Sequence, residues 1–415
     1  MEQTYYDARE TRDPGEREIA LTAALPRIIA AAQRDATAYR QSLAGIRPDS
    51  IASRQALAEL PLTRKSELID LQRQNPPFGG FTTVATANVS RVFASPGPIY
   101  EIEARRPDFF RMGRALYAAG IRAGDLIHNT FSYHLTPAGA MLESAGLALG
   151  CPVIPAGTGQ TELQLRTIAD LRPVAYVGTP SFLKILCDRA TESSSDIASI
   201  EKALVGAEAF PAVLRSEFRG RGITALQCYG TADLGLIAYE TSGPDGTACD
   251  GMVVDEGIIL ELVEPGTGTP VALGEVGEVV VTTLTAEYPL IRFATGDLSA
   301  LLLEPSPCGR TNQRIKGWLG RADQSAKVRG MFVHPTQVGE IARRHPAVRR
   351  ARLVIERPQS ADAMTLFVEI DAQDEAAAIA ATAQAVTKLR TEVTCVPIGS
   401  LPQDGKLIED RRPIG

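Results

Sequence analysis

The feature that most restricts the fold is a regular alternation of strand-like and helix-like segments between residues 107 and 236. CPVIPAG (151–157) and PVAYVGTP (173–180) are short and apolar, whereas TELQLRTIADLR (161–172) and PSFLKILCDRA (180–190) have the apolar spacing of a helix. Strands that alternate with helices of this length form right-handed crossover units. The pattern therefore predicts an α/β fold with a parallel sheet and layers of helices.

Three loops in this region follow predicted strands. They are Gly178-Thr179-Pro180, Gly206-Ala207-Glu208 and the longer Tyr229-Gly230-Thr231-Ala232-Asp233. In open α/β sheets, ligands bind beyond the carboxyl ends of the strands. We therefore expect the functional site at these loops.

Two further patterns follow along the chain. From about Ile237, period-2 runs such as GEVGEVVVTTL, divided by Gly and Pro turns, predict a small antiparallel sheet or barrel over residues 237–322. After Asp323 the composition fits a compact α+β domain of small size. The expected organisation is a large N-terminal domain (residues 1–322, with 237–322 as a β-rich subdomain) and a small C-terminal lid domain (residues 323–415).

Near the N-terminus, the spacing of apolar residues predicts one long helix over residues 17–45. Residues 88–104 predict two strands joined by the tight turn Ser95-Pro96-Gly97-Pro98. A Gly-containing turn after a strand can face a phosphate with its backbone N–H groups, but the two prolines have none to offer. Composition therefore favours a plain hairpin over an anion-binding loop.

The turn Thr295-Gly296-Asp297 carries an acid that could hold two hydroxyls of a sugar, because an ionised carboxylate only accepts hydrogen bonds. Gly320-Arg321-Ala322-Asp323 connects two predicted strands and could act as a pivot, since hinges are a few residues at element ends. These residues indicate a nucleotide-like site beside a movable joint. A hairpin turn with a satisfied surface Asp is the alternative, and both stay open at this point.

Charge and composition narrow the class of protein. A net charge of -6 over 415 residues argues against a nucleic-acid or membrane-surface role. No apolar run approaches the roughly 20 residues of a membrane span, and the N-terminus is polar and acidic. The six cysteines are scattered without CxxC spacing, which predicts free thiols in a reducing cytoplasm.

Several motifs occur in a fixed order along the chain. They are AYRQSLAGIRPDSIASRQALAELPLTRKSEL, YAAGIRAGDLI, GAEAFP, YGTADLGLIAYE, PLIRFATGDLSALLL, SPCGRT, GRADQSAKVRGMFVHPTQVGEI and LPQDGK. With these motifs the chain resembles the adenylate-forming ligases, and within them the phenylacetate–CoA ligases. The resemblance covers nearly the whole chain and implies ATP, Mg2+ and coenzyme A as cofactors.

The resemblance also implies roles for residues at matching positions. It implies a nucleotide site in which Gly206, Ala207 and Glu208 lie along the adenine. Tyr229, Gly230 and Thr231 would surround the adenine and the acyl-phosphate. Asp297 and Arg321 would bind the ribose, and Ser95 and Gly97 would belong to the phosphate loop.

Catalytic and mobile residues follow in the same way. Asp233 stands where the family has a glutamate that holds Mg2+, and Lys406 stands where it has its catalytic lysine. Asp323 matches the hinge. Tyr133 falls where the family lines the acyl pocket, and His134 beside it is either a substrate contact or a hydrogen-bonded core imidazole.

The sequence departs from the family at the phosphate end. The loop is shorter, has no lysine and has lost N–H donors, and Ala232 replaces a hydroxyl residue. Some relatives carry a Cys/His zinc cluster, of which Cys308 remains, with Cys249 nearby. Two soft ligands do not close a tetrahedral site, so we do not expect zinc.

Two functional hypotheses result. The first is an ATP-dependent, AMP-forming ligase that joins an aryl or hydrophobic carboxylic acid, phenylacetate-like, to coenzyme A through an acyl-adenylate. The second is a nucleotide or acyl-CoA binding protein, or an ATP-independent acyl transferase, on the same fold. Both predict a small-molecule carboxylic acid as partner, no nucleic acid and no membrane, and leave a homodimer open.

Overall fold

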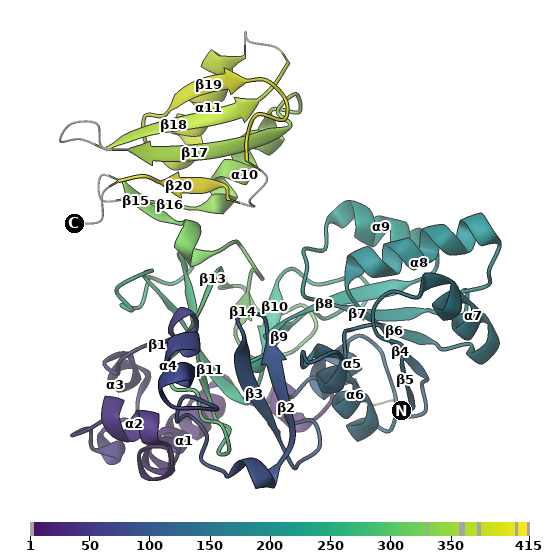
Figure 1. Cartoon of the computed structure of the whole chain (residues 1–415), viewed down its shortest axis with the longest axis vertical. Helices are drawn as coiled ribbons and strands as arrows, with labels where there is room; N and C mark the ends of the chain where they lie inside the picture. Colours follow the sequence, from purple (N-terminus) through teal and green to yellow (C-terminus); the bar gives the residue numbers. More distant parts are fainter. Residues whose placement is uncertain (1–3, 329–330, 357–361, 372–374, 403–405, 413–415) are drawn as a thin grey trace.

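The computed structural model describes residues 4–328, 331–356, 362–371, 375–402 and 406–412. A large N-terminal part carries a smaller C-terminal part. A narrow connector above β13 (Phe293–Leu302), formed by residues 316–325, joins the two (Figure 1). Each part has its own cluster of buried apolar side chains, and the C-terminal cluster extends from Ala326 to Ile408. This separation supports the expected division near residue 323, which stays a prediction.

A run of parallel strands lies at the centre of one lobe, in the order β8-β7-β6-β4-β5. Helices α8 and α9 cover one face of these strands, and α5 and α6 cover the other (Figure 1). The elements are β4 (Ile127–Asn129), β5 (Val153–Pro155), β6 (Ala175–Gly178), β7 (Lys202–Val205), β8 (Thr224–Thr231), α5 (Gly113–Ala118), α6 (Ala138–Ala148), α7 (Thr161–Leu171), α8 (Pro180–Ser193) and α9 (Ala212–Gly220). The predicted α/β fold class is confirmed.

The antiparallel strands after residue 235 are hydrogen-bonded to this parallel run. Strand β8 pairs antiparallel with β9, and the sheet continues through β10, β14, β13, β12 and β11, with β1 parallel to β13. The β8/β9 pairing has a register shift between Tyr229 and Gly230. The elements are β1 (Thr63–Arg64), β9 (Gly235–Tyr239), β10 (Met252–Val254), β11 (Ile258–Val263), β12 (Val276–Thr283), β13 (Phe293–Leu302) and β14 (Arg314–Ile315).

The N-terminal helix is shorter than the sequence predicted. Helix α1 (Pro14–Asp35) ends at Ala36, which is extended, and a separate helix α2 (Thr37–Ser42) follows, so one helix over 17–45 was wrong. The break has a tertiary cause, because the N–H of Ala38 bonds to the carbonyl of Gly80 rather than within a continuous helix. At its other end α1 begins as expected from local chemistry, with Asp13 as N-cap and proline at the first helical position.

Short elements complete the N-terminal part. Strands β2 and β3 form the hairpin that the sequence predicted. The elements are β2 (Val89–Ser95), β3 (Ile99–Ala104), α3 (Arg54–Ala58), α4 (Leu68–Gln74) and the 3-10 turns η1 (Ala8–Thr11), η2 (Pro48–Ser50), η3 (Lys65–Glu67) and η4 (Thr86–Asn88).

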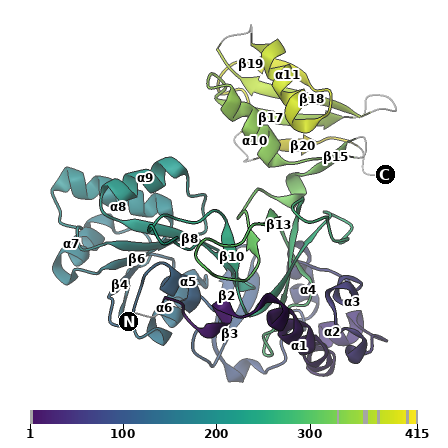
Figure 2. The same cartoon turned by 180° about the vertical axis from the view of Figure 1, so that it is seen from behind.

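The C-terminal part packs two helices on a sheet of order β19-β18-β17-β20, as the view from behind also shows (Figure 2). Its elements are η5 (Ala322–Gln324), β15 (Ala326–Val328), β16 (Met331–Val333), α10 (Pro335–Arg344), β17 (Arg350–Glu356), β18 (Ala363–Glu369), α11 (Ala376–Thr387), β19 (Glu392–Val396) and β20 (Ile408–Asp410). Among the described residues, none of the helices has the length and apolar character needed to span a bilayer.

Candidate active site

The most densely bonded acid among the predicted site residues is Asp297 on β13. Its Oδ2 accepts from the Tyr229 hydroxyl at 2.9 Å. Its Oδ1 accepts from Arg321 Nη1 at 3.0 Å and from the Trp318 indole N–H at 3.1 Å. Burial, and then the charge of Asp297, raise the pKa of Tyr229 well above its usual value, so this hydroxyl stays a donor. Three residues that the sequence predicted to share a site therefore meet here.

Backbone pairing explains why Arg321 reaches Asp297. The segment after β14 runs antiparallel to β13: Leu298 N–H donates to the Gly320 carbonyl at 2.8 Å, and Asp297 and Arg321 form a β-bridge. Gly296 has φ +76°, and a Cβ there would stand 2.5 Å from Arg321 Nη2. The turn therefore needs glycine so that the guanidinium can lie over it.

A cavity of about 200 Å³ opens beside the loops at the carboxyl ends of the strands. Four predicted nucleotide residues line it, together with Ser95 of the hairpin and an apolar wall. The lining residues are Ser95, Pro96, Met112, Phe131, Thr136, Pro137, Ala138, Met141, Leu142, Gly206, Ala207, Cys228, Gly230, Thr231 and Ala232. Apolar walls with a few convergent polar groups are typical of small-molecule sites.

Glu208, Tyr133 and His134 are among the predicted site residues that do not line this cavity. Glu208 is exposed, and its carbonyl accepts from Gln227 Nε2 at 2.9 Å. The Tyr133 hydroxyl accepts from Asn129 Nδ2 at 2.8 Å, so it supports the loop from behind. His134 is exposed and is therefore not a core imidazole. The acyl-pocket roles of Tyr133 and His134 stay predictions, while Phe131, Met141 and Leu142 supply the apolar wall.

Asp233 is buried and paired with a cation that sequence reasoning did not assign to the site. Lys65 Nζ lies 2.6 Å from Asp233 Oδ2, and the Asp233 side chain is 0% exposed. Lys65 is placed by β1, whose Thr63 and Arg64 pair with Phe293 and Ala294 of β13. Because these segments lie far apart in sequence, local patterns gave no signal for the pair.

A second acid lies near this ion pair. Glu101 on β3 is 0% exposed, and Ser95 Oγ donates a short hydrogen bond to its Oε1. Burial, and then the charge of Asp233, raise the pKa of Glu101 to about 8. Among the described residues, Glu101 Oε2 and Asp233 Oδ1 are buried without a hydrogen-bond partner. Two carboxyl groups therefore lie buried beneath the hairpin with one ammonium group, and the raised pKa keeps Glu101 protonated at neutral pH.

This arrangement does not suit a metal at Asp233. The carboxylate is covered, and Lys65 already supplies its cation. Over the described ranges, no three His, Cys, Asp or Glu side chains are grouped so that they could hold a metal ion. Magnesium binding by Asp233 stays a prediction that would require Lys65 to leave.

A further cavity of about 360 Å³ lies between Lys65 and the Thr295-Gly296 turn that precedes Asp297. Lys65, Glu278, Thr295, Gly296 and Arg321 are among its lining residues. Three basic residues, Arg64, Lys65 and Arg321, and one acid, Glu278, thus line one space beside the turn that carries Asp297. Such a space can receive an anionic group attached to a ligand held at Asp297.

The hairpin turn itself offers few donors. Pro96 and Pro98 have no N–H, and the predicted phosphate-loop residue Gly97 lies between them. The Ser95 hydroxyl is directed inward to Glu101 and to the Ile99 carbonyl at 3.4 Å. Neither predicted loop residue directs a side-chain donor into the cavity in this arrangement.

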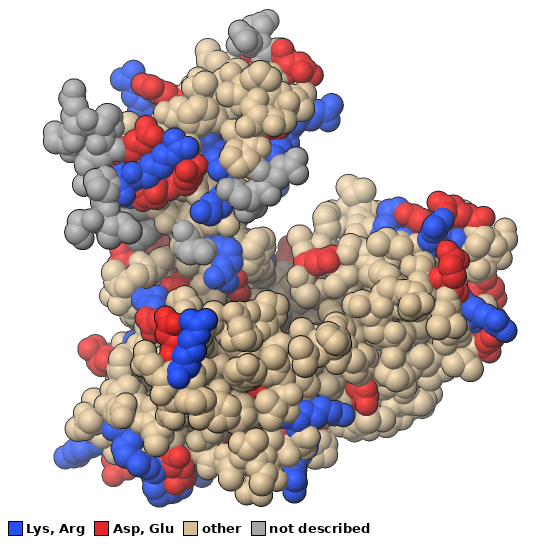
Figure 3. Space-filling model, in the orientation of Figure 1, with Lys and Arg blue, Asp and Glu red and all other residues tan. Residues whose placement is uncertain are grey.

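Lys406 and the hinge lie at the junction of the two parts. Lys406 is exposed, and the N–H of the next residue, Leu407, donates to Gln324 Oε1 at 3.1 Å. The backbone of Asp323 lies in η5, while its side chain is outside the described residues. The surface is hollowed between the C-terminal part and the lobe that carries α8 and α9 (Figure 3).

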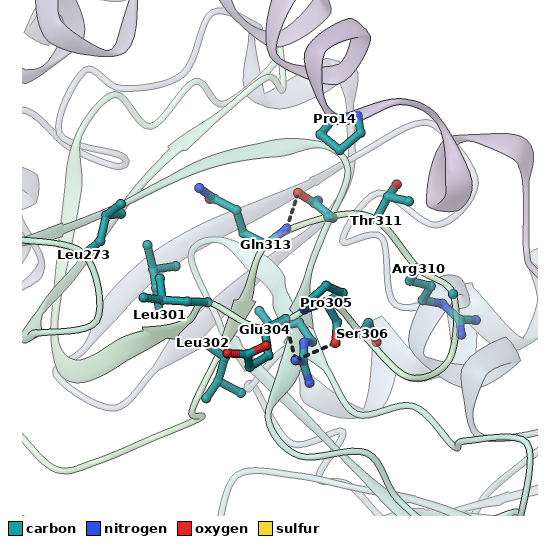
Figure 4. Close-up of a pocket in the computed structure, with 14 residues that line it drawn as sticks. Pro14, Leu273, Leu301, Leu302, Glu304, Pro305, Ser306, Arg310, Thr311 and Gln313 are labelled. Carbon is teal, nitrogen blue, oxygen red and sulfur yellow. Dashed lines mark hydrogen bonds between the residues drawn. The ribbon is translucent and has the colours of Figure 1, made fainter.

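Another cavity, of about 500 Å³, lies away from these residues, under the loop around Ser306 (Figure 4). Leu273, Leu301 and Leu302 line one side of it, and none of the predicted site residues lines it. Nearby, burial would raise the pKa of the Cys308 thiol, but hydrogen bonds, first from Ser306, outweigh it and bring the pKa to about 7.

Comparison with known proteins identifies relatives of the whole chain. The AMP-binding enzyme family matches residues 111–285. The phenylacetate–coenzyme A ligase of Thermus thermophilus is 34% identical over 361 residues, covering 83% of this chain and 80% of that protein. The phenylacetate–coenzyme A ligase of Escherichia coli is 30% identical over 436 residues, covering 97% of this chain and 96% of that protein.

Among solved structures, an open conformation of 2-hydroxyisobutyryl-CoA ligase has a TM-score of 0.87 at 23% identity, covering 98% of this chain and 95% of that chain. The same enzyme in its thioesterification state has a TM-score of 0.72, and the match covers 99% of this chain and 93% of that chain. At this identity the likeness concerns the fold.

The fold and the site define an adenylate-forming enzyme, the class in which a carboxylic acid is activated with release of pyrophosphate. Within that class the relatives indicate one family, since two phenylacetate–coenzyme A ligases match at 30% identity or more over at least four fifths of their own length. The chain belongs to the phenylacetate–CoA ligase family. The predicted family and the predicted enzyme class, an AMP-forming acid–thiol ligase, are confirmed.

Proposed function

We propose that this chain activates an aryl or other hydrophobic carboxylic acid, with phenylacetate as the representative substrate, and transfers it to coenzyme A. The observation that carries the proposal is the clustering of Asp297, Tyr229 and Arg321 next to a cavity with apolar walls. A carboxylate with fixed donors suits a ribose, and the apolar wall suits the body of the acid. With six free cysteines, we assign the enzyme to the reducing cytoplasm.

In the first half-reaction, a carboxylate oxygen of the substrate attacks the α-phosphorus of ATP, and the bond to the bridging oxygen of pyrophosphate breaks. Asp297 would hold the ribose hydroxyls, while the backbone of Gly206 and Ala207 and of Gly230 and Thr231 would border the adenine and the new acyl-phosphate. Both reactants are anionic, so the barrier is largely electrostatic. Cations fixed near the phosphates lower it.

Lys65 and Lys406 are two cations of this chain that would serve that task. Lys65 lines the cavity that also contains Arg321, and its pairing with Asp233 holds it in place. Lys406 lies on the C-terminal part and would act only while that part is closed over the hollow. Mg2+ would enter with ATP, held mainly by phosphate oxygens and water, as this ion commonly is.

In the second half-reaction, the coenzyme A thiolate attacks the carbonyl carbon of the acyl-adenylate, and AMP leaves. We propose that residues 323–415 turn about Asp323 between the two steps. The solved relative, which is described in open and thioesterification states, matches this chain with TM-scores of 0.87 and 0.72 respectively. The higher TM-score with the open state supports an open arrangement of the two parts in the structure described here.

The test is pyrophosphate release and thioester formation over a panel of acids that includes phenylacetate, ring-substituted aryl acids and short 2-hydroxy acids. Lys406→Ala should reduce adenylation by about 100-fold or more, because a positioned ammonium near developing charge contributes on the order of 3 kcal/mol. Lys388→Ala, at another exposed lysine of the C-terminal part, is the matched control. Absence of turnover on every acid, with nucleotide clearly bound, would contradict the proposal.

The proline-containing hairpin supports a second candidate, a nucleotide or acyl-CoA binding protein or an ATP-independent acyl transferase. Ser95 directs its hydroxyl inward, and two prolines remove N–H donors where phosphates would lie. Calorimetry with ATP, AMP and coenzyme A separates the two candidates. Coenzyme A binding without ATP binding favours the second, whereas ATP binding with pyrophosphate release favours the first.

A further inference from the structure

Trp318 is the one tryptophan in the sequence and has an unusual environment. About half of its surface is exposed (53%), yet its indole N–H donates to Asp297 Oδ1 at 3.1 Å. It lies on the connector, between Gly317 and the β-bridge of Arg321 with Asp297. Sequence reasoning gave it no role, because an exposed tryptophan on a connector has no recognisable spacing signal.

The number of acceptor positions on Asp297 makes this contact consequential. An ionised carboxylate has about four lone-pair positions. The Tyr229 hydroxyl uses one on Oδ2, and Arg321 and Trp318 use two on Oδ1. Two ribose hydroxyls need two positions. One present donor must therefore leave before both hydroxyls can bind.

Trp318 is the donor that leaves at the lowest cost. Tyr229 projects from β8 within the sheet, and its hydroxyl is buried. Arg321 bears the opposite charge to Asp297 and also donates to the Thr295 carbonyl at 3.2 Å, so its loss would cost more. Trp318 contributes a neutral hydrogen bond from a half-exposed ring, which water can replace.

We propose that Trp318 occupies the acceptor position of Asp297 that a ribose hydroxyl takes, and that it is released when nucleotide binds. The inference rests on the proposed function and adds to it a positioning residue that reports nucleotide occupancy to the connector. Trp318 is close enough to β13 to affect the connector, because the N–H of the next residue, Leu319, donates to the Leu298 carbonyl of β13 at 2.9 Å. Gly317 (φ +86°) and Gly320 (φ +130°) flank Trp318 with backbone that can pivot.

Release of the indole thus loosens one side chain that fastens the connector to the N-terminal part. Filling the ribose position and freeing the connector become one event. A ligand without a ribose, such as adenine, would bind without freeing Trp318, because nothing then competes for the acceptor position on Asp297. Trp318 is a positioning residue that competes with a ribose hydroxyl for Asp297, and it is not a catalytic group.

The single tryptophan allows a direct test in the full chain. Fluorescence of Trp318 is measured during titration with AMP, with calorimetry on the same samples. We expect a red-shifted emission and stronger quenching by acrylamide, with a half-saturation that equals the calorimetric Kd. Adenine alone, which lacks the ribose, should leave the emission unchanged.

Trp318→Phe provides a second readout, because it keeps a ring but removes the N–H. Since one competing neutral hydrogen bond is lost, AMP should bind about 2- to 10-fold more tightly and the KM for ATP should fall by a similar factor. A residue with a merely structural role would instead weaken binding. Val213→Ala, at an exposed apolar residue of α9, is the control and should change neither quantity.

The outcomes separate this inference from the proposed function. AMP binding by calorimetry with unchanged Trp318 emission overturns the inference alone, as does weaker AMP binding by Trp318→Phe. Absence of AMP binding overturns the proposed function and, with it, the inference. A ribose-dependent emission change together with tighter binding by the variant supports both.

Discussion

The two ends of the proposed nucleotide site differ in the hydrogen-bond donors that the chain places at them. At the nucleoside end, Asp297 receives three side-chain donors, and a backbone bridge to Arg321 fixes its position. At the phosphate end, the hairpin tip has prolines on both sides of Gly97, and the acid Glu101 lies buried beneath it. One end is built from contacts within a sheet, and the other is a turn with few donors.

The contrast between the two ends indicates which groups of this chain could bind the phosphates. A turn without N–H groups cannot surround an anion, so charge has to come from elsewhere. Arg64, Lys65 and Arg321 line a common cavity next to the proposed nucleoside end. We propose that these residues, rather than the hairpin, supply the positive charge for the phosphates.

The largest expected effect is at the nucleoside end. Asp297→Ala should weaken AMP binding by about 100- to 1,000-fold, because two charge-assisted hydrogen bonds to the ribose are lost. Isothermal calorimetry measures the change. Asp297→Asn keeps a hydrogen-bond acceptor and the same side-chain size, so it should lose less AMP affinity than Asp297→Ala. Equal AMP affinity in Asp297→Ala and the unmodified chain would place the ribose elsewhere.

The next effect tests whether Lys65 serves the phosphate end. Lys65→Met should raise the KM for ATP by about 10- to 100-fold and change AMP affinity much less, since a charge-assisted contact to the outer phosphates is removed. It also leaves Asp233 buried without a cation, which can destabilise the fold by about 3–5 kcal/mol.

Asp233→Asn combined with Lys65→Met removes that unpaired charge and serves as the control for folding. The surface lysine Lys184, paired with Asp188 on α8, gives a matched charge-removal control. If the double variant regains stability and also a normal KM for ATP, Lys65 has only a structural role.

A smaller effect concerns the pH dependence of stability. The pKa of Glu101 rises from 4.5 in the unfolded reference to about 8 in the fold. Between these values the folded chain binds more protons, so the free energy of unfolding falls as pH rises and levels off above about pH 8.

Glu101→Gln should remove this dependence and stabilise the chain at neutral pH by an amount on the order of a few kcal/mol. Thermal unfolding from about pH 5 to about pH 8 measures it, with the exposed Glu392→Gln as control. An unchanged pH slope in Glu101→Gln would mean that Glu101 does not hold a proton in the fold.

The smallest effect tests the hairpin directly. Pro96→Ser adds one N–H at an exposed position of the turn. If phosphates pass over the turn, the KM for ATP should fall by about 2- to 10-fold, the value of a single hydrogen bond, while AMP binding is unchanged. No change in either constant would show that the phosphates pass elsewhere.

Much of the nucleoside end could be predicted from sequence because its members occur in local patterns. Tyr229 follows a predicted strand, and Asp297 and Arg321 occur in turns with recognisable glycine spacing. Lys65 could not be predicted, since its partner Asp233 is 168 residues away and no local pattern marks Lys65 as part of a site. Glu101 was read as part of a strand, and its burial depends on what packs over the hairpin.

The sequence by itself determined the α/β alternation, the family and the order of the motifs, because periodicity and short motifs are properties of neighbouring residues. Only the tertiary structure decided that the antiparallel strands extend the parallel sheet, that the predicted long helix breaks at Ala36, and that Trp318 and Lys65 join the site. Each of these depends on hydrogen bonds or ion pairs between segments distant in the chain. Such contacts exist only after the sheet has formed.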